Sequence, residues 1–436
     1  MKTKLFERKE YLDSLDAWRD KEVIKVITGV RRCGKSSLLA LYIEILRASG
    51  VTESNIININ LEDMKNRELL VPEALHDYIV QRISDQGTTY VFIDEVQLCP
   101  DFERAVVSLN LRDTVDLYIT GSNASLLSGD FATLLAGRYV EIEMLPLSFK
   151  EYVEFALNGY PNSEGKAREF PMRMILASRD PELHLNPDVL FDDYMRFGGF
   201  PYIPMLQKDS QTVIDYLGMI YNTIVLKDTV KLAKVNDIML LEDIVRFLCS
   251  SIGSPISIKK ISDTINSAGR KISPNTVEQY IRALTDSFVF YKVDRFDIRG
   301  KQHLKTQNKY YIVDSGIRNM LISSSSPDTG HVLENIVFLE LLRRAKNKKV
   351  NIGKIDDKEV DFVVLNLSGG LSYYQVAASV LNESTLKREL EPLAKIPDHY
   401  PKYLLTLDGL FTNTFHNGIK LMNILDWLFY GDEYTR

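Results

Sequence analysis

The sequence contains little cysteine and no long apolar run. Its 436 residues include three cysteines, and Cys33, Cys99 and Cys249 lie far apart, with no CxxC pair and no histidine at ligand spacing. These absences exclude a disulfide framework and a zinc site, and they indicate a reducing compartment. The first residues, MKTKLFERKEYLDSL, lack the apolar core of a signal peptide, and no run of about 18 apolar residues occurs. We therefore expect a cytoplasmic protein without membrane contact.

Two classes of nucleotide-dependent protein are excluded in the same way. A dinucleotide-binding fold needs GxGxxG after its first strand and a protein kinase needs an HRD loop, and neither run is present. The chain also lacks an excess of positive charge, because its formal net charge is −6. Any contact with nucleic acid must then come from a local basic patch. The length and the 45% hydrophobic content predict a multidomain globular protein.

The clearest motif that is present is a phosphate-binding loop. A strand-like run over residues 23–28 precedes GVRRCGKS, and apolar residues at helical spacing follow it. Loop amides and a helix N-terminus cradle phosphates in such motifs, while the Lys35 ammonium reaches the β and γ phosphates and the Ser36 hydroxyl binds Mg²⁺. The predicted nucleotide-binding residues are Gly29, Val30, Arg31, Arg32, Cys33, Gly34, Lys35, Ser36 and Ser37.

Two further strand-like runs end in polar residues. The apolar run TTYVFIDEVQ (88–97) is typical of a buried parallel strand, and it delivers Asp94 as a magnesium ligand and Glu95 as the residue that polarises the attacking water. The run VDLYIT (115–120) leads into Ser122 and Asn123, which are either sensors of the γ-phosphate or caps of an ordinary loop. A third run, IININLED (56–63), also ends in two acids, to which we assign no role.

Five segments carry a resemblance to a known family. The segments GVRRCGKSSLL, YVFIDEVQ, YITGSN, LLAGRYVEIEMLPLSFKEY and YMRFGGFP resemble prokaryotic AAA-type ATPases whose C-terminal part is a domain of unknown function. The resemblance extends over nearly the whole chain and implies an α/β protein with ATP and Mg²⁺ as cofactors. It implies an AAA-like parallel-sheet domain at 1–150, a helical lid at 151–240, a winged helix at 241–305 and a restriction-endonuclease-like domain at 306–436.

The family's Leu-x-Gly-Arg element is Leu135-Ala136-Gly137-Arg138 in this sequence. The resemblance makes Arg138 a candidate sensor or arginine finger, and a finger of this kind requires an oligomer. An arginine that neutralises charge on the transferred phosphoryl group can lower the barrier by several kcal/mol. A structural salt bridge explains Arg138 equally well, and the sequence leaves both interpretations open.

Residues 254–296 have the pattern of two short helices followed by a strand. In SPNTVEQYIRALTDS, Ser273 is a helix cap, Pro274 begins the helix, and the apolar residues Val277, Ile281 and Leu284 share one face. If this winged-helix pattern binds DNA, the contacting residues come from the opposite face and the following hairpin. They are Asn275, Glu278, Gln279, Arg282, Lys292, Arg295, Arg299 and Lys301. Protein docking or packing against the lid remains an equal alternative.

The C-terminal third has a nuclease-like order of acids. A helix over 331–345 carries Glu334, the strand KEVDFVV (358–364) carries Asp361, and the strand SYYQVAAS (372–379) carries Gln375. Restriction-type nucleases place a lysine two residues after the last of these positions, where this chain has Ala377. Alanine can neither orient a water molecule nor stabilise negative charge. The alternatives are a non-cleaving relic that is structural or binds nucleic acid, an active nuclease, or an unrelated domain, and the missing lysine argues against cleavage.

Together these features predict an ATPase whose catalytic residues are Lys35, Glu95 and Arg138. Its nucleotide state is expected to act on a C-terminal half that binds DNA or a protein partner. Two alternatives stay open at this point. One is a metal-dependent nuclease that the ATPase regulates, and the other is a nucleotide switch that binds ATP without hydrolysing it.

Overall fold

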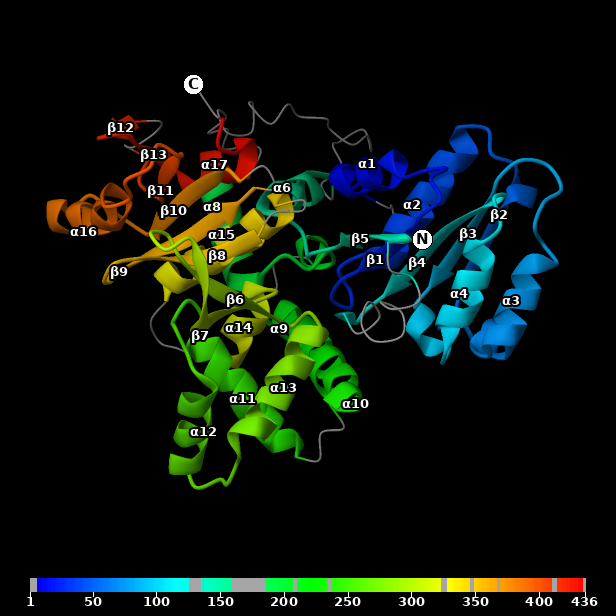
Figure 1. The fold of residues 1–436 in the computed structure, drawn as a ribbon, viewed down its shortest axis with the longest axis horizontal. Coiled ribbons are helices and arrows are strands. Elements are labelled where there is room, and N and C mark those ends of the chain that lie inside the picture. Colours follow the sequence, from blue (N-terminus) through cyan, green and yellow to red (C-terminus); the bar gives the residue numbers. More distant parts are fainter. Residues whose placement is uncertain are drawn as a thin grey trace. The chain divides into compact units, whose positions relative to one another are not determined.

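A computed structural model describes residues 6–124, 135, 137–158, 186–206, 210–233, 237–322, 328–345, 349–366, 369–409 and 414–433. The chain divides into two units (Figure 1): Met1–Pro146 with Asp286–Phe288, and Leu147–Thr285 with Val289–Arg436. Residues 159–185 of the predicted lid, and Ala136 of the Leu-Ala-Gly-Arg element, lie outside the described residues. Within the described parts, no helix is long and apolar enough to span a lipid bilayer.

The first unit is built on a five-stranded parallel sheet. Its strands lie in the order β2-β3-β4-β1-β5. Every residue of β1 and β3 is buried, as expected for strands that helices cover on both faces. The strand bounds are β1 Ile24–Thr28, β2 Ile56–Asn60, β3 Thr89–Asp94, β4 Val115–Gly121 and β5 Tyr139–Glu143.

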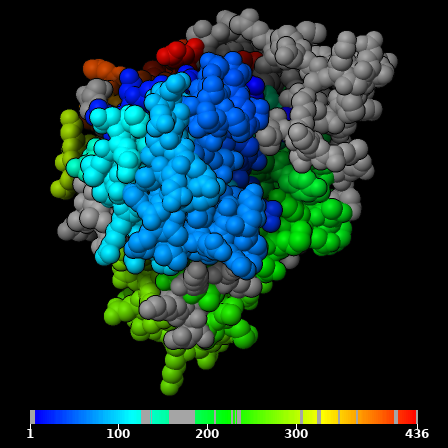
Figure 2. Space-filling view, turned by 90° about the vertical axis from the view of Figure 1, so that its right-hand side faces the viewer, coloured from blue at the N-terminus to red at the C-terminus, as the bar shows by residue number. Residues whose placement is uncertain are grey.

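Helices cover both faces of this sheet (Figure 1). On one face, Tyr42 packs its ring against Phe92 and Tyr118 of the sheet. On the other, Leu75 and Val106 join a buried aliphatic cluster. Figure 2 shows this unit from the β2 side, as a surface of blue to cyan segments. The helices are α1 Lys9–Ala17, α2 Lys35–Ala48, α3 Pro72–Val80 and α4 Phe102–Asn110, with short 3₁₀ segments η1 Glu53–Asn55, η2 Met64–Leu70 and η3 Val96–Leu98.

The second unit begins with helices. They are α6 Phe149–Asn158, α8 Pro187–Phe197, the 3₁₀ turn η5 Ile203–Met205, α9 Ser210–Tyr221, the π-helix η6 Asn222–Thr229 and α10 Val230–Ala233. After α8 the chain turns at Gly198 and Gly199, where the backbone meets the buried carboxylate of Asp314. A Cβ on Gly198 would lie 2.0 Å from Oδ1 of Asp314, and the Gly199 N–H donates to Oδ2 at 2.7 Å. Glycine is therefore required in the RFGGFP segment for a tertiary contact.

Three helices and a hairpin follow. They are α11 Ile238–Ser250, α12 Ile258–Ser267, α13 Pro274–Asp286, β6 Phe290–Asp297 and β7 Gln302–Ile312. An isolated antiparallel bridge joins Ile256, between α11 and α12, to Asn308 of β7. The predicted faces of α13 are confirmed, because Val277, Ile281 and Leu284 are buried. The four residues predicted to face outward are exposed, and they are Asn275, Glu278, Gln279 and Arg282.

The hairpin is part of an eight-stranded mixed sheet with the order β12-β13-β11-β10-β9-β8-β6-β7. The helix α15 precedes an antiparallel meander of β8, β9 and β10, and α16 then leads to β11, which pairs parallel with β10. The predicted boundary at residues 305 and 306 falls inside β7. The hairpin also continues into the C-terminal sheet, because β6 pairs with β8. The remaining elements are α14 Ser315–Leu321, α15 Thr329–Arg344, β8 Lys349–Ile355, β9 Lys358–Leu365, β10 Leu371–Ala377, α16 Glu383–Ala394, β11 Lys402–Thr406, β12 Thr414–His416, β13 Ile419–Asn423 and α17 Ile424–Tyr430.

Candidate functional site

The phosphate loop joins the carboxyl end of β1 to the first turn of α2. Gly34 is the N-cap residue of α2 and has a φ of 110°. No side chain caps this helix end, so the first N–H groups of α2 are available to another acceptor. The ammonium of Lys35 is buried and donates to the backbone oxygens of Gly29 at 2.9 Å and Val30 at 3.2 Å. Loop and lysine thus form a positively polarised cradle of the kind that binds phosphate.

The loop is held tightly against the rest of the unit. A Cβ on Gly29, whose φ is 137°, would lie 2.1 Å from the backbone oxygen of Met144, so only glycine fits there. The buried Arg8 guanidinium donates to the backbone oxygens of Cys33, at 3.1 Å, and Leu145, at 2.8 Å. Burial raises the pKa of the Cys33 thiol, which argues against a reactive thiolate and for a packing role.

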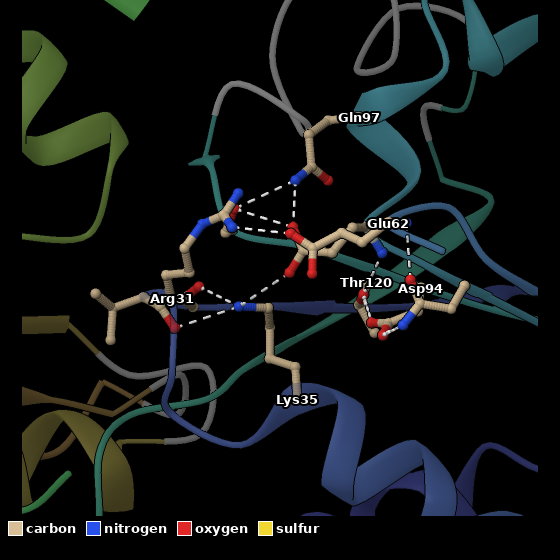
Figure 3. A network of polar contacts seen from close by, with 11 residues as sticks. Arg31, Lys35, Glu62, Asp94, Gln97 and Thr120 are labelled. Carbon is tan, nitrogen blue, oxygen red and sulfur yellow. Dashed lines mark hydrogen bonds and ion pairs between the residues drawn. The ribbon is translucent and has the colours of Figure 1, made fainter. Parts of the chain in front are cut away.

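Asp94 and Glu95 stand at the carboxyl end of β3, and Figure 3 shows Asp94 beside Lys35 of the loop. The Thr120 hydroxyl of β4 donates to Oδ1 of Asp94 at 2.6 Å and accepts from the Glu95 N–H at 2.8 Å. The pKa of Asp94 is raised, mainly because the carboxyl group is buried, although hydrogen bonds from Thr120 and Ser36 act in the opposite direction. The structure therefore brings Ser36 and Asp94 together, and their oxygens suit Mg²⁺.

Glu95 adopts an uncommon backbone conformation. Its φ is 56° and its ψ is 50°, a left-handed geometry that costs a non-glycine residue free energy and recurs at functional sites. Its Oε2 accepts from the Ser122 hydroxyl at 3.2 Å and from the Gln97 amide, and its Oε1 lies 4.0 Å from Nζ of Lys35. The predicted sensor Ser122 thus contacts the predicted catalytic acid directly, whereas the neighbouring Asn123 is half-buried.

Arg138 lies at the amino-terminal ends of the strands, which is the opposite edge of the sheet from the phosphate loop. It precedes β5, and its backbone oxygen accepts from the N–H of Ile24, at the start of β1. The loop follows Thr28 at the end of β1, which pairs with Glu143 at the end of β5. Four residues of strand, roughly 13 Å, separate the two edges. Arg138 is exposed, and this position excludes it from contact with phosphate bound in the loop of its own chain.

A second polar cluster lies in the C-terminal sheet. Nζ of the buried Lys309, on β7, is 2.9 Å from Oε1 of Glu334 and 2.7 Å from Oε1 of Glu359. The Tyr311 hydroxyl donates to Oε1 of Glu334 at 2.6 Å. Burial lowers the pKa of Lys309, but Glu334, Asp361 and Glu359 outweigh this and raise it above its usual value. The lysine is therefore charged, and it neutralises part of the acidic cluster.

Asp361 and Gln375 belong to the same cluster. Oδ2 of Asp361 accepts from the Val376 N–H at 2.8 Å, and the Asp361 N–H donates to Oε1 of Gln375 at 3.3 Å. Burial, followed by the nearby Glu334, raises the pKa of Asp361 well above its usual range. The three predicted positions thus meet in space. Within the described ranges, however, no group of three or more His, Cys, Asp or Glu side chains is arranged to hold a metal ion.

Two family models match separate parts of the chain. The family model of an AAA domain matches residues 21–153, and the model called Domain of unknown function (DUF8612) matches residues 188–328. An uncharacterized protein of Haemophilus influenzae is 36% identical over 429 residues, which cover 98% of this chain and 100% of that protein. The chain belongs to the family of that protein.

Similar proteins also occur in an archaeon. The uncharacterized protein MJ1544 of Methanocaldococcus jannaschii is 29% identical over 85% of this chain and 78% of its own length. Among solved structures, the Walker-type ATPase PABY2304 of Pyrococcus abyssi has a TM-score of 0.49 and 15% identity over 72% of this chain and 95% of that one. AMPPCP-bound DnaA from Aquifex aeolicus has a TM-score of 0.28 and 13% identity over 63% and 86% of the two chains.

Sequence reasoning did not find three residues that the structure places in these clusters. Thr120 lies in an apolar strand, Gln97 follows Asp94 and Glu95, and Lys309 stands in a cation-rich strip that resembles a solvated surface. The sequence nevertheless gave an indication for Thr120, because a strand parallel to β3 brings its last polar residue to the edge that carries Asp94 and Glu95. Lys309 carried none, since the pairing of the hairpin with the C-terminal strands was not predictable from local pattern.

Proposed function

We propose that the N-terminal unit binds and hydrolyses ATP with Mg²⁺. The observation that carries this proposal is the meeting of the Lys35 loop with Asp94 and Glu95 at one edge of the sheet. The loop amides and Lys35 would hold the phosphates, and Ser36 and Asp94 would hold the metal, which supplies charge neutralisation when bound. The matching AAA domain supports this assignment.

Glu95 is the proposed general base. Its carboxylate lies close to Lys35, and it is oriented by the Gln97 amide and the Ser122 hydroxyl. A carboxylate in this place can accept a proton from a water molecule that attacks the terminal phosphate. Gln97 and Ser122 both bind Oε2 of Glu95, whereas Oε1 lies 4.0 Å from Nζ of Lys35, so Oε1 is the oxygen proposed to accept the proton.

The test of this proposal is nucleotide binding and turnover by purified protein. We expect Lys35→Ala to abolish ATP binding, whereas Glu95→Gln should bind ATP and turn it over at least about 100-fold more slowly. The exposed residues Lys65 and Glu73 provide matched controls, and Lys65→Ala and Glu73→Gln should leave both properties unchanged. Wild-type protein that binds ATP but shows no single turnover would instead establish the non-hydrolysing switch.

For the second unit we propose a partner-binding role that responds to nucleotide state. The order α11, α12, α13, β6 and β7, with the bridge from Ile256 to Asn308, supports a winged helix. Its hairpin offers cations, but Lys292 lies 3.9 Å from Asp294 and Arg299 lies 3.0 Å from Asp356. Stimulation of ATP hydrolysis by duplex DNA, lost with rising salt, would establish DNA as the partner.

We propose that the C-terminal cluster does not cleave nucleic acid. The carboxylates of Glu334 and Glu359 are already paired with the Lys309 ammonium, and residue 377 is alanine. We propose that the second unit keeps the shape of a nuclease-like domain in a structural or binding role. Incubation of DNA or RNA with the protein and Mn²⁺ tests this, because cleavage that is lost in Asp361→Ala would overturn it.

A further inference from the structure

The phosphate loop contains an arginine that is paired with an acid from a different part of the sheet. Nη1 of Arg31 lies 2.9 Å from Oε1 of Glu62. The Arg31 side chain is 18% exposed and the Glu62 side chain is 49% exposed. Glu62 follows β2, and the sequence alone gives it no role.

The strand order determines where this ion pair lies. β1, which leads into the loop, and β2, which leads to Glu62, are separated in the sheet by β4 and β3. Three strand spacings, roughly 14 Å, therefore have to be crossed at the carboxyl edge. The same edge carries Asp94, Glu95 and Ser122, and Figure 3 shows Arg31 and Glu62 in one polar network with Lys35 and Asp94. The Arg31–Glu62 pair thus extends over the ends of the strands that bear the catalytic acids.

We propose that Arg31 exchanges partners, from Glu62 without nucleotide to the terminal phosphate of a bound nucleoside triphosphate. This inference rests on the proposed function of the loop. A partly exposed ion pair contributes little, whereas an arginine–phosphate contact is charge-assisted and can be bidentate. A triphosphate therefore competes well with Glu62 for the guanidinium. A diphosphate lacks the terminal phosphate that Arg31 would bind, so it leaves the Arg31–Glu62 ion pair in place.

The geometry makes Arg31 the residue that distinguishes triphosphate from diphosphate. Arg138 is excluded from this task in its own chain, because it lies at the opposite edge of the sheet. In the nucleotide-free protein, Glu62 competes with the triphosphate for Arg31 and so lowers the affinity for triphosphate. Release of Glu62 also frees the segment after β2, which provides a route by which the terminal phosphate is sensed outside the loop.

The test is a comparison of affinities measured by isothermal titration calorimetry with Mg²⁺ and either ADP or the non-hydrolysable triphosphate AMPPCP. We expect Arg31→Ala to weaken AMPPCP binding by about 30-fold and ADP binding by less than about 3-fold, the loss typical of a truncated charge pair. Glu62→Gln should tighten AMPPCP binding by about 2- to 5-fold and leave ADP unchanged. Arg82, which follows α3, is exposed and lies outside the loop, and Arg82→Ala is the control that should leave both affinities unchanged.

The outcomes separate this inference from the proposed function. Equal effects of Arg31→Ala on both nucleotides, or no effect, would overturn the exchange while leaving nucleotide binding intact. If wild-type protein binds neither nucleotide, the proposed function itself fails. Glu62→Gln provides an answer that does not depend on the folding of Arg31→Ala, because unchanged AMPPCP affinity in this variant also contradicts the exchange.

Discussion

Nζ of Lys309 lies 2.9 Å from Oε1 of Glu334, and both side chains are almost completely buried. An ammonium thus stands inside an acidic cluster, on a strand that precedes Glu334, Asp361 and Gln375 in the chain. The pair links the hairpin strand β7 to α15. A buried charge pair of this kind is more sensitive to the loss of one partner than to the loss of both.

We expect Lys309→Met to destabilise the second unit by about 3–5 kcal/mol, because it leaves buried carboxylates without a counter-charge. The double variant Lys309→Met with Glu334→Gln should recover part of this loss. The chain has two tryptophans, and Trp427 is fully buried in α17. Urea unfolding followed by Trp427 fluorescence in a Trp18→Phe background therefore reports on the second unit. Lys292→Met, at a 49% exposed side chain, is the control, and a loss as small as in this control would contradict the prediction.

Gly198 and Gly269 offer a matched pair of glycine substitutions. Both have positive φ, 81° and 93°, but a Cβ on Gly198 meets Asp314 whereas a Cβ on Gly269 has nothing within 4 Å. Gly269→Ala should cost about 1 kcal/mol from backbone strain alone. Gly198→Ala should cost at least about 2 kcal/mol more, because the buried carboxylate has to move. Equal losses by the same fluorescence measurement would show that the Asp314 contact does not matter.

Asp314 should make stability depend on pH. Burial raises its pKa to about 6, although the N–H groups of Gly199, Ile317 and Gly316 act in the opposite direction. The folded state then binds more protons than the unfolded state between about pH 4 and 6. The contribution of Asp314 is therefore most favourable below this window and is lost as the pH rises through it. Relative to Asp314→Asn, the wild-type free energy of unfolding should fall by ~2.4 kcal/mol from pH 4 to pH 7, and a constant difference would refute this.

Thr120 should affect hydrolysis more than binding. Its hydroxyl connects Asp94 to the Glu95 N–H, so Thr120→Val removes a contact that orients both acids while keeping the shape of the side chain. We expect ATP turnover to fall by about 10- to 100-fold, with ATP affinity within about 3-fold of wild type. Thr120→Ser restores the hydroxyl and should restore turnover. Failure of serine to rescue would indicate that packing, and not the hydrogen bonds, is what matters.

Arg138→Ala should leave nucleotide binding by an isolated chain unchanged, because the residue lies at the opposite edge of the sheet. In dilute protein, ATP affinity and turnover should stay within about twofold of wild type. If turnover of the wild type rises with protein concentration and that of Arg138→Ala does not, the arginine acts on a second copy. Loss of ATP binding in the dilute variant would contradict the observed placement.

Local patterns in the sequence were sufficient for several elements and for residues that neighbour each other in the chain. The GxxxxGKS run lies between β1 and α2 as predicted, since the loop, the preceding strand and the following helix form one continuous segment. The apolar face of α13 was predictable because helical periodicity is a property of the chain itself. The positions Glu334, Asp361 and Gln375 were predictable from the order of a helix and two adjacent strands.

The tertiary structure alone decided which distant residues meet. The strand order β2-β3-β4-β1-β5 brings Glu62 to Arg31. The parallel pairing of β5 with β1 leaves Arg138 at the amino-terminal ends of these strands, away from the loop. The pairing of β6 with β8 joins the hairpin to the C-terminal sheet and so brings Lys309 to Glu334. The physical reason is that a strand's periodicity defines its buried faces but not its neighbours, which depend on how the whole sheet closes its core.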